Sequence, residues 1–202
     1  MFYAVTAMAT ALASTSREFH IAPMQCYTNQ PLRKLAGFLS PSSTKWTEME
    51  KVDDLLPNIE EALEKRLGGE KDCANLVLQL GSNDVNKLHS CVRVAEANYP
   101  NLREINLNCG CPAIDTGGAS TYGASLMKNP SLTAQLVNSM ATATNIDISV
   151  KCRIGVFDSV EDYRPLDEKD YQYLTNYISD VYSAGAKHVI LHARPAILSM
   201  NP

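Results

Sequence analysis

The sequence lacks the features that mark a membrane protein or a zinc protein. Its longest apolar stretches fall far short of the ~20 residues that a membrane-spanning helix needs. None of its six cysteines belongs to a CxxC pair, and the CxC formed by Cys109 and Cys111 has no second pair or nearby histidine to complete a zinc site. These absences predict a protein without a membrane span or a metal site, in a reducing intracellular compartment.

The chain is also short of positive charge. Its formal net charge is -4 over 202 residues, which gives no general basic surface for nucleic acid and leaves only a local basic patch open. Residues 1–16 contain no charged side chain. They predict an N-terminal extension that is either frayed or a targeting segment, although the arginine enrichment of an organellar signal is missing. We expect a cytoplasmic protein, with an organelle as the alternative.

The remaining residues, 17–202, have the composition and the pattern of one globular unit. The chain is 45% hydrophobic, enough for a single core. Hydrophobic periodicity predicts helices at 28–39, with Leu32, Leu35, Ala36 and Leu39 on the inner face, and at 52–67, 83–98, from 130 onward and at 167–184. Six strands are expected to alternate with them, at 18–24, 44–49, 74–80, 102–108, 147–153 and 188–192.

Polar or reactive side chains fall at the C-terminal ends of five of these strands. They are Met24, Gln79, Asn108 with Cys111, Lys151 with Arg153, and His192. Such a spread favours a (β/α)8 TIM-type barrel, whose active sites lie at that face, over a doubly wound sheet that uses mainly one switch point. A complete barrel has eight strands and ~250 residues, so we expect an incomplete barrel with about six βα units.

The most informative stretch runs from Glu104 to Met127. An alternating strand leads into Cys109-Gly110-Cys111-Pro112 and then into a glycine-rich loop, as in an active site built from loops. A thiol can hold a proton at neutral pH and still release it, which suits a general acid. Most cysteines are small packing residues, and we interpret Cys26, Cys73, Cys91 and Cys152 in that way. Cys111, between Gly and Pro, fits packing poorly.

Lys151 and Arg153 form a second candidate pair. Strand alternation places both on the same side, opposite Val150 and Cys152. Two adjacent cations need an anionic or electron-rich partner, which is either a nearby carboxylate or a ligand such as a reduced flavin. The residues alone leave both possibilities open.

The same stretches resemble a known family. NLNCGCP at 106–112, followed by GGASTYGASLM at 117–127, resembles the signature loop of the tRNA-dihydrouridine synthases, FMN-dependent oxidoreductases that reduce uridine in tRNA. APM at 22–24, TEM at 47–49, LQLG at 78–81, VKCRIG at 150–155 and HAR at 192–194 match further elements of that family in the same order.

The resemblance implies residue roles and a reaction. Ala22, Pro23, Met24, Gln79, Lys151 and His192 would bind FMN, whereas Asn108 and Arg153 would lie on the substrate side. NADPH would reduce the flavin, hydride would pass from flavin N5 to uracil C6, and Cys111 would protonate C5. The stretch 158–174 resembles the branch that acts on the D-loop, so the implied partner is tRNA and the implied process is tRNA modification.

The chain also departs from the family pattern. Ala113 stands where a serine is common after GCP, Pro195 stands where a lysine often follows HAR, and no glycine-rich phosphate-binding pair is visible. In barrels that phosphate site usually follows strands seven and eight, so we expect a C-terminally truncated member. The alternatives are another FMN barrel oxidoreductase acting on a free pyrimidine, and a non-catalytic remnant that binds RNA or a partner chain.

Overall fold

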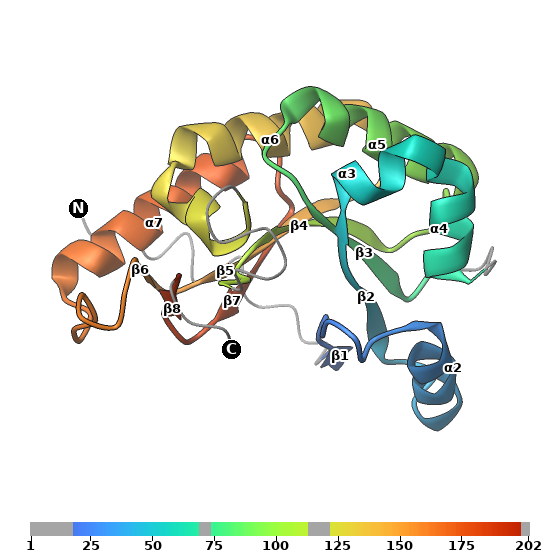
Figure 1. The fold of residues 1–202 in the computed structure, drawn as a ribbon, viewed down its shortest axis with the longest axis horizontal. Coiled ribbons are helices and arrows are strands. Elements are labelled where there is room, and N and C mark those ends of the chain that lie inside the picture. Colours follow the sequence, from blue (N-terminus) through green and yellow to red (C-terminus); the bar gives the residue numbers. More distant parts are fainter. Residues whose placement is uncertain (1–17, 69–73, 113–121, 199–202) are drawn as a thin grey trace.

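The fold is built on one parallel sheet whose strands follow one another in chain order (Figure 1). The structure is a computed structural model and describes residues 18–68, 74–112 and 122–198. The six strands of the sheet are β1 (His20–Ile21), β2 (Thr44–Lys51), β3 (Leu76–Gly81), β4 (Glu104–Cys109), β5 (Ile148–Arg153) and β7 (His188–His192). All neighbouring pairs are parallel.

This strand order decides between the two architectures considered above. A doubly wound sheet reverses its strand order at a switch point, whereas the sheet here runs β1-β2-β3-β4-β5-β7 without a reversal. Sequential parallel strands joined by helices are the topology of a (β/α)8 barrel. The expected fold class is therefore confirmed, and the described residues form six consecutive strands of such a barrel.

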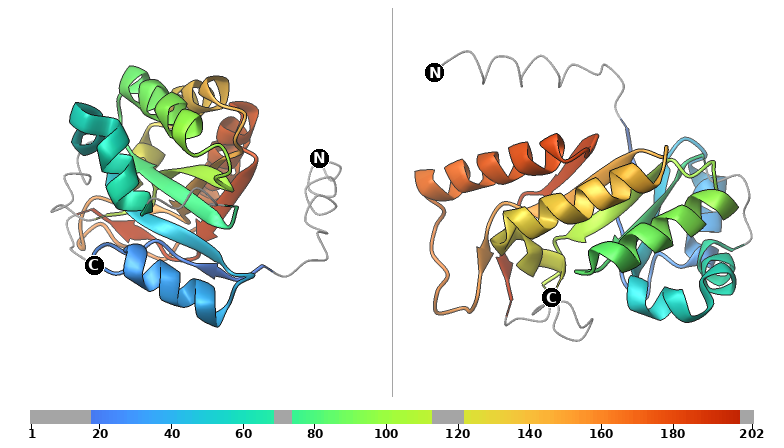
Figure 2. Two further views of the ribbon diagram at one scale, coloured as in Figure 1. Left: turned by 90° about the vertical axis from the view of Figure 1, so that its right-hand side faces the viewer. Right: turned by 90° about the horizontal axis from the view of Figure 1, so that it is seen from above.

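The helices cover one face of the sheet. Figure 1 shows α5 (Val85–Asn98), α6 (Pro130–Ala143) and α7 (Glu168–Ser183) arched over the strands, and Figure 2 shows them side by side from above. The remaining helical elements are α2 (Gln30–Leu39), α3 (Val52–Leu55), α4 (Ile59–Leu67), and the 3-10 turns η1 (Leu56–Asn58) and η2 (Gly123–Lys128). A second, two-stranded sheet pairs β6 (Val156–Phe157) with β8 (Ala196–Ile197).

The main core lies between the sheet and these helices. Leu107 of β4 and Val150 of β5 are fully buried against helix residues such as Leu88 and Leu136. Because side chains alternate along a strand, the residues between them point to the other face. That second face carries polar groups, including Gln79 and Asn106, so each central strand is apolar toward the helices and polar toward the barrel interior.

Local capping chemistry explains where the helices begin. Asn129 accepts a hydrogen bond from the Leu132 amide at 3.1 Å and precedes Pro130, which occupies the first turn of α6 as expected. Helix α7 begins with a capping box between Asp167 and Asp170. These caps fix the ends of the helices that pack over β4, β5 and β7.

One expected helix is divided in the structure, and one expected strand is shorter. The helix predicted over 52–67 is divided into α3, η1 and α4, because Pro57 has no amide hydrogen to continue the helical ladder. The strand predicted over 18–24 is reduced to His20–Ile21, and Pro23, two residues after this short pairing, cannot donate to a ladder.

The predicted inner face of α2 is wrong in part. Leu35 and Leu39 are 53% and 78% exposed, whereas Arg33 and Ala36 are buried. The Arg33 guanidinium donates to the carbonyl oxygens of Thr28 and Arg66, both at 2.6 Å, and these bonds give its buried head two backbone partners. The hydrogen-bonding capacity of this arginine therefore sets the orientation of the helix, which leucine spacing alone does not predict.

Candidate active site

The backbone of Cys111 is held from two sides. The side-chain oxygen of Asn108 accepts hydrogen bonds from the amides of Gly110 and Cys111, at 3.1 and 2.9 Å. The Cys111 carbonyl oxygen accepts from the Ala124 amide at 2.9 Å. The loop that begins at Cys111 is therefore anchored at both ends, although residues 113–121 lie outside the described part of the chain. Cys111 itself is half-buried.

Gly123 is required by this closure. Its φ is +68°, in the left-handed region that favours glycine, and a Cβ atom added there would lie 2.5 Å from the Cys111 carbonyl oxygen. The preceding Tyr122 is buried, and its ring lies 3.0 Å from the position that a Cβ on Gly81 would take. Burial, and then the charges of Asp54 and Asp53, raise the pKa of the Tyr122 phenol. Two glycines thus permit the close packing around Cys111.

Gln79 and Asn108 are bound to each other. The Asn108 amide nitrogen donates to the Gln79 side-chain oxygen at 2.8 Å, and the Gln79 nitrogen donates to the Asn106 side-chain oxygen at 2.8 Å. Both residues were predicted to contact ligands, at the C-terminal end of their strands. The structure brings them together beside Cys111, and it shows that the Asn108 side chain also supports the cysteine loop.

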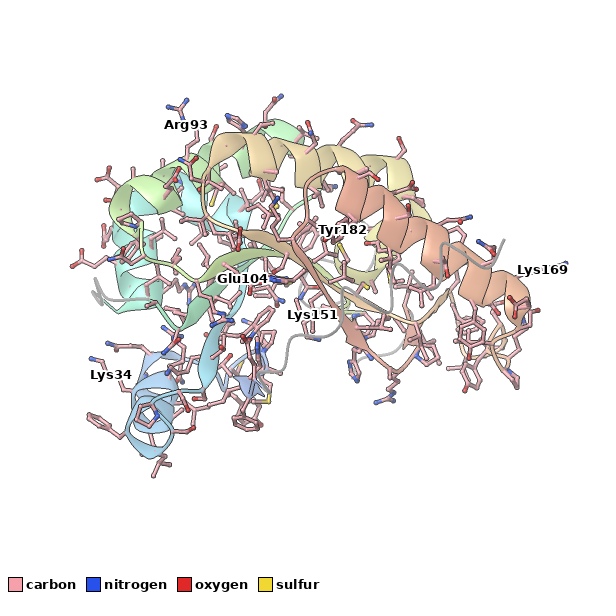
Figure 3. All side chains as sticks on the ribbon, turned by 180° about the vertical axis from the view of Figure 1, so that it is seen from behind. Lys34, Arg93, Glu104, Lys151, Lys169 and Tyr182 are labelled. Atoms are coloured by element: carbon pink, nitrogen blue, oxygen red, sulfur yellow. The ribbon has the colours of Figure 1, made fainter. Side chains whose placement is uncertain are left out.

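Lys151 and Arg153 lie on the interior face of β5, as the strand alternation predicts (Figure 3 shows Lys151 near the middle of the sheet). Arg153 pairs in register with His192 of β7, and its Nε donates to the Gly110 carbonyl oxygen at 2.8 Å. Burial, and then the charge of Arg153, lowers the pKa of Lys151. The predicted site residues of β5 and β7 therefore lie together, next to the cysteine loop.

Arg194 joins this group, and the sequence analysis did not assign it a role. His192 and Arg194 are both exposed. Slight desolvation, followed by the charges of Arg153, Lys151 and Arg194, lowers the pKa of His192. Burial and the charge of Arg194 also lower the pKa of Arg153. The signal that could have pointed to Arg194 is its place two residues after the end of β7. These four residues (Lys151, Arg153, His192 and Arg194) are called the basic cluster below.

The basic cluster has no counter-ion among the residues that the structure describes: no carboxylate lies within 4.0 Å of a charged nitrogen of these four side chains. Other basic residues do have such partners, for example Lys128 with Asp158. Since like charges lower the stability of one another's charged forms, the cluster is suited to an anionic or electron-rich ligand.

Ala22, Pro23 and Met24 lie elsewhere on the same rim. They follow β1, the strand at the edge of the sheet opposite β7. The Met24 carbonyl oxygen accepts from the amides of Tyr27 and Thr28, which makes a turn, and its side chain is 45% exposed. The structure thus places the three residues at a C-terminal strand end, as predicted, across the sheet from His192.

The sequence analysis also missed Asn106 and Ser149. Both are completely buried on the interior face, and the Asn106 amide nitrogen donates to the Ser149 hydroxyl oxygen at 2.8 Å. Their alternation with Leu107 and Val150 is the signal that could have identified them. Among the described residues, no group of three or more His, Cys, Asp or Glu side chains is arranged to hold a metal ion. In the same residues, no helix is long and apolar enough to cross a membrane.

Sequential parallel strands with polar groups at their C-terminal ends define an α/β protein of the TIM-barrel type with a loop-built site. Residues 20–200 match the family model described as dihydrouridine synthase (Dus), and the chain therefore belongs to this family. The resemblance inferred from the sequence is confirmed.

Two curated proteins that are similar to this chain have the same name. The chain is 35% identical over 189 residues to a tRNA-dihydrouridine(20/20a) synthase of Xanthomonas campestris pv. campestris, which covers 93% of this chain and 52% of the relative. It is 34% identical over 184 residues to the protein of the same name from Shewanella oneidensis, covering 90% and 50%. The chain thus spans about half the length of the curated relatives it matches. A histidinol phosphate phosphatase structure from Lactococcus lactis aligns with a TM-score of 0.32 at 8% identity, too low to carry an argument.

Proposed function

We propose that this chain carries the catalytic half of a tRNA-dihydrouridine synthase, which reduces the C5–C6 double bond of a D-loop uridine in tRNA. The observation that carries the proposal is the position of Cys111, a half-buried thiol whose backbone is fixed on both sides and which adjoins the basic cluster. A proton donor must be held at one place relative to the reacting carbon, and these bonds provide that restraint.

The residues present fit FMN. A reduced flavin gathers negative charge on its pyrimidine edge, and the basic cluster offers cations that no described carboxylate neutralises. Gln79 gives one amide hydrogen to Asn106 and has another to offer a ligand. Lys151, His192 and Gln79 would hold the flavin ring, together with Ala22, Pro23 and Met24 from the far edge of the sheet. When bound and reduced by NADPH, FMN supplies the hydride for uracil C6.

The chain's own residues supply the proton and the orientation. Cys111 gives its proton to uracil C5. Arg153 lies on the substrate side, where its Nε bond to the Gly110 carbonyl links it to the cysteine loop. Asn108 supports the backbone of Cys111, and its contact with the substrate stays a prediction. Residues 17–202 then form the N-terminal part of a flavin-binding barrel domain in an intracellular protein, and residues 1–16 a separate extension.

The experiment combines two measurements on the purified chain. Visible absorbance after incubation with FMN and gel filtration reports whether flavin stays bound. Dihydrouridine is then quantified by mass spectrometry in tRNA from a strain that lacks this modification, after incubation with NADPH and FMN. We expect bound flavin, and dihydrouridine formation that Cys111→Ala lowers by roughly 10²-fold or more, the scale of a lost general acid.

Cys26→Ala is the matched control: the packing role expected for Cys26 is wrong, because it is exposed in the turn after β1, and it has no assigned role. It should leave both measurements unchanged. A chain that neither retains FMN nor forms dihydrouridine would contradict the proposal. Reduction of free uracil in preference to tRNA would point instead to an oxidoreductase of free pyrimidines.

A further inference from the structure

A continuous chain of hydrogen bonds crosses the barrel interior and ends at the backbone of Cys111. It begins at the Ser149 hydroxyl of β5 and passes to Asn106 of β4, to Gln79 of β3, and back to Asn108 of β4. Each of these three bonds is 2.8 Å long. Its last member, Asn108, accepts from the amides that open the cysteine loop. We call these four side chains the amide chain.

All four members are buried, with exposures of 0% for Asn106 and Ser149, 1% for Gln79 and 7% for Asn108. The strand register explains their contact, because Gln79 pairs with Asn106 and Asn106 pairs with Ser149. Paired residues on neighbouring strands point to the same face of the sheet. In such surroundings a side-chain amide that loses its partner is costly, so each member constrains the next.

The amide chain can have only one direction. The amides of Gly110 and Cys111 can only donate, so Asn108 must present its oxygen to them and its nitrogen to Gln79. Gln79 must then present its oxygen to Asn108 and its nitrogen to Asn106. By the same rule Asn106 directs its nitrogen to Ser149. Only this orientation of each amide satisfies the backbone donors at one end and every neighbouring amide in the chain.

We propose that Asn106, supported by Ser149, is a positioning residue that fixes the orientation of Gln79 and Asn108 and, through Asn108, holds the backbone of Cys111. Asn106 is completely buried and bonds to Gln79 and Ser149. It acts on the reaction only through the proposed roles of Gln79 and Cys111, so this proposal rests on the proposed function. Loss of Asn106 would free Gln79 to rotate, and a rotated Gln79 would place a donor against the Asn108 donor.

The test reads the thiol directly and needs neither flavin nor tRNA. The rate of Cys111 alkylation by iodoacetamide is measured by peptide mass spectrometry in the wild-type chain, in Asn106→Leu, in Asn108→Ala and in the double variant. Since a hydrogen bond to a buried group changes an equilibrium on the order of tenfold, we expect each single variant to accelerate alkylation by roughly that factor. The double variant should be no faster than Asn108→Ala alone, because Asn106 acts through Asn108.

Two controls separate positioning from general destabilisation. Ser139→Ala removes a buried hydroxyl that donates to the Val85 carbonyl oxygen in the helical layer, and it should leave the Cys111 rate unchanged. Alkylation of the exposed Cys26 in the same samples should also stay constant. If Asn106→Leu does not fold, Ser149→Ala deletes a single oxygen and should accelerate Cys111 alkylation roughly threefold, the lower end for one hydrogen bond.

The proposal would be overturned if the acceleration of Cys111 alkylation in the double variant equalled the product of the accelerations in the two single variants. It would also be overturned if Asn106→Leu lowered stability but left Cys111 alkylation at the wild-type rate. Either result would leave the proposed function standing. Conversely, a chain that neither retains FMN nor forms dihydrouridine would refute the proposed function without changing the alkylation result.

Discussion

Glu50 should make this protein less stable as the pH rises, the opposite of the usual effect of a paired carboxylate. Its side chain, on β2, is 7% exposed, and its carboxylate lies 3.1 Å from the Nε of Arg66, whose side chain is 44% exposed. Burial raises the pKa of Glu50 from 4.5 to about 7, although the charge of Arg66 acts in the opposite direction. Desolvation of the carboxylate therefore outweighs its ion pair.

The consequence for folding follows from proton binding. Between pH 4.5 and about 7 the folded protein holds a proton on Glu50 that the unfolded chain has released. Stability from this group is thus largest at acid pH and falls as the pH rises through that window. Because one pKa unit corresponds to about 1.4 kcal/mol, the loss amounts to at most about 3 kcal/mol at pH 8.

Glu50→Gln removes the charge and keeps an oxygen that can accept from Arg66. The variant should be more stable than the wild type at pH 8, by up to about 3 kcal/mol, and nearly equal to it at pH 4.5. Urea unfolding followed by circular dichroism at both pH values measures the difference. Glu60→Gln, at an exposed position of α4, should show no such pH dependence. Equal or lower stability of Glu50→Gln at pH 8 would refute the reasoning, since it would mean that Arg66 outweighs burial.

Three further predictions concern the site and a helix end. Gly123→Ala should destabilise the protein by about 1–2 kcal/mol through its positive φ alone. It should also lower dihydrouridine formation, because the new Cβ displaces the Cys111 carbonyl. A variant with wild-type activity would contradict the close approach of Gly123 to the Cys111 carbonyl. Lys151→Met should weaken FMN binding roughly tenfold in a fluorescence titration, whereas Lys87→Met, which removes an exposed ion pair with Asp53, should not. Asp167→Ala should lower the unfolding free energy by about 1 kcal/mol in urea, and an unchanged midpoint would show that the cap does not stabilise α7.

Much of the fold could be predicted because each βα unit carries its own signals. The strand at 148–153 alternates between core residues and cations, and Asn129 with Pro130 marks the start of α6. The family resemblance predicted that Gln79, Asn108 and Cys111 all belong to the site, and the structure places them in one connected group.

The rest depended on contacts between distant residues. The burial of Arg33 requires the Arg66 carbonyl, which is 33 residues away, and no local pattern indicates that partner. Asn106 and Ser149 were missed because strand alternation predicts which face a residue points to but not which polar partner it meets there. Their hydrogen bonds become visible only when the register of β3, β4 and β5 is known.

The sequential order of the strands also bears on how the protein is made. The strands of the main sheet lie side by side in the order in which they occur along the chain. Every new strand can therefore pair with an edge that has already been synthesised. Chains fold from the N-terminus as they emerge from the ribosome, and neighbouring elements find each other with short connections. Here that would let the sheet grow by one βα unit at a time, and the support of the cysteine loop would be complete only once β5 has added Ser149 and Arg153.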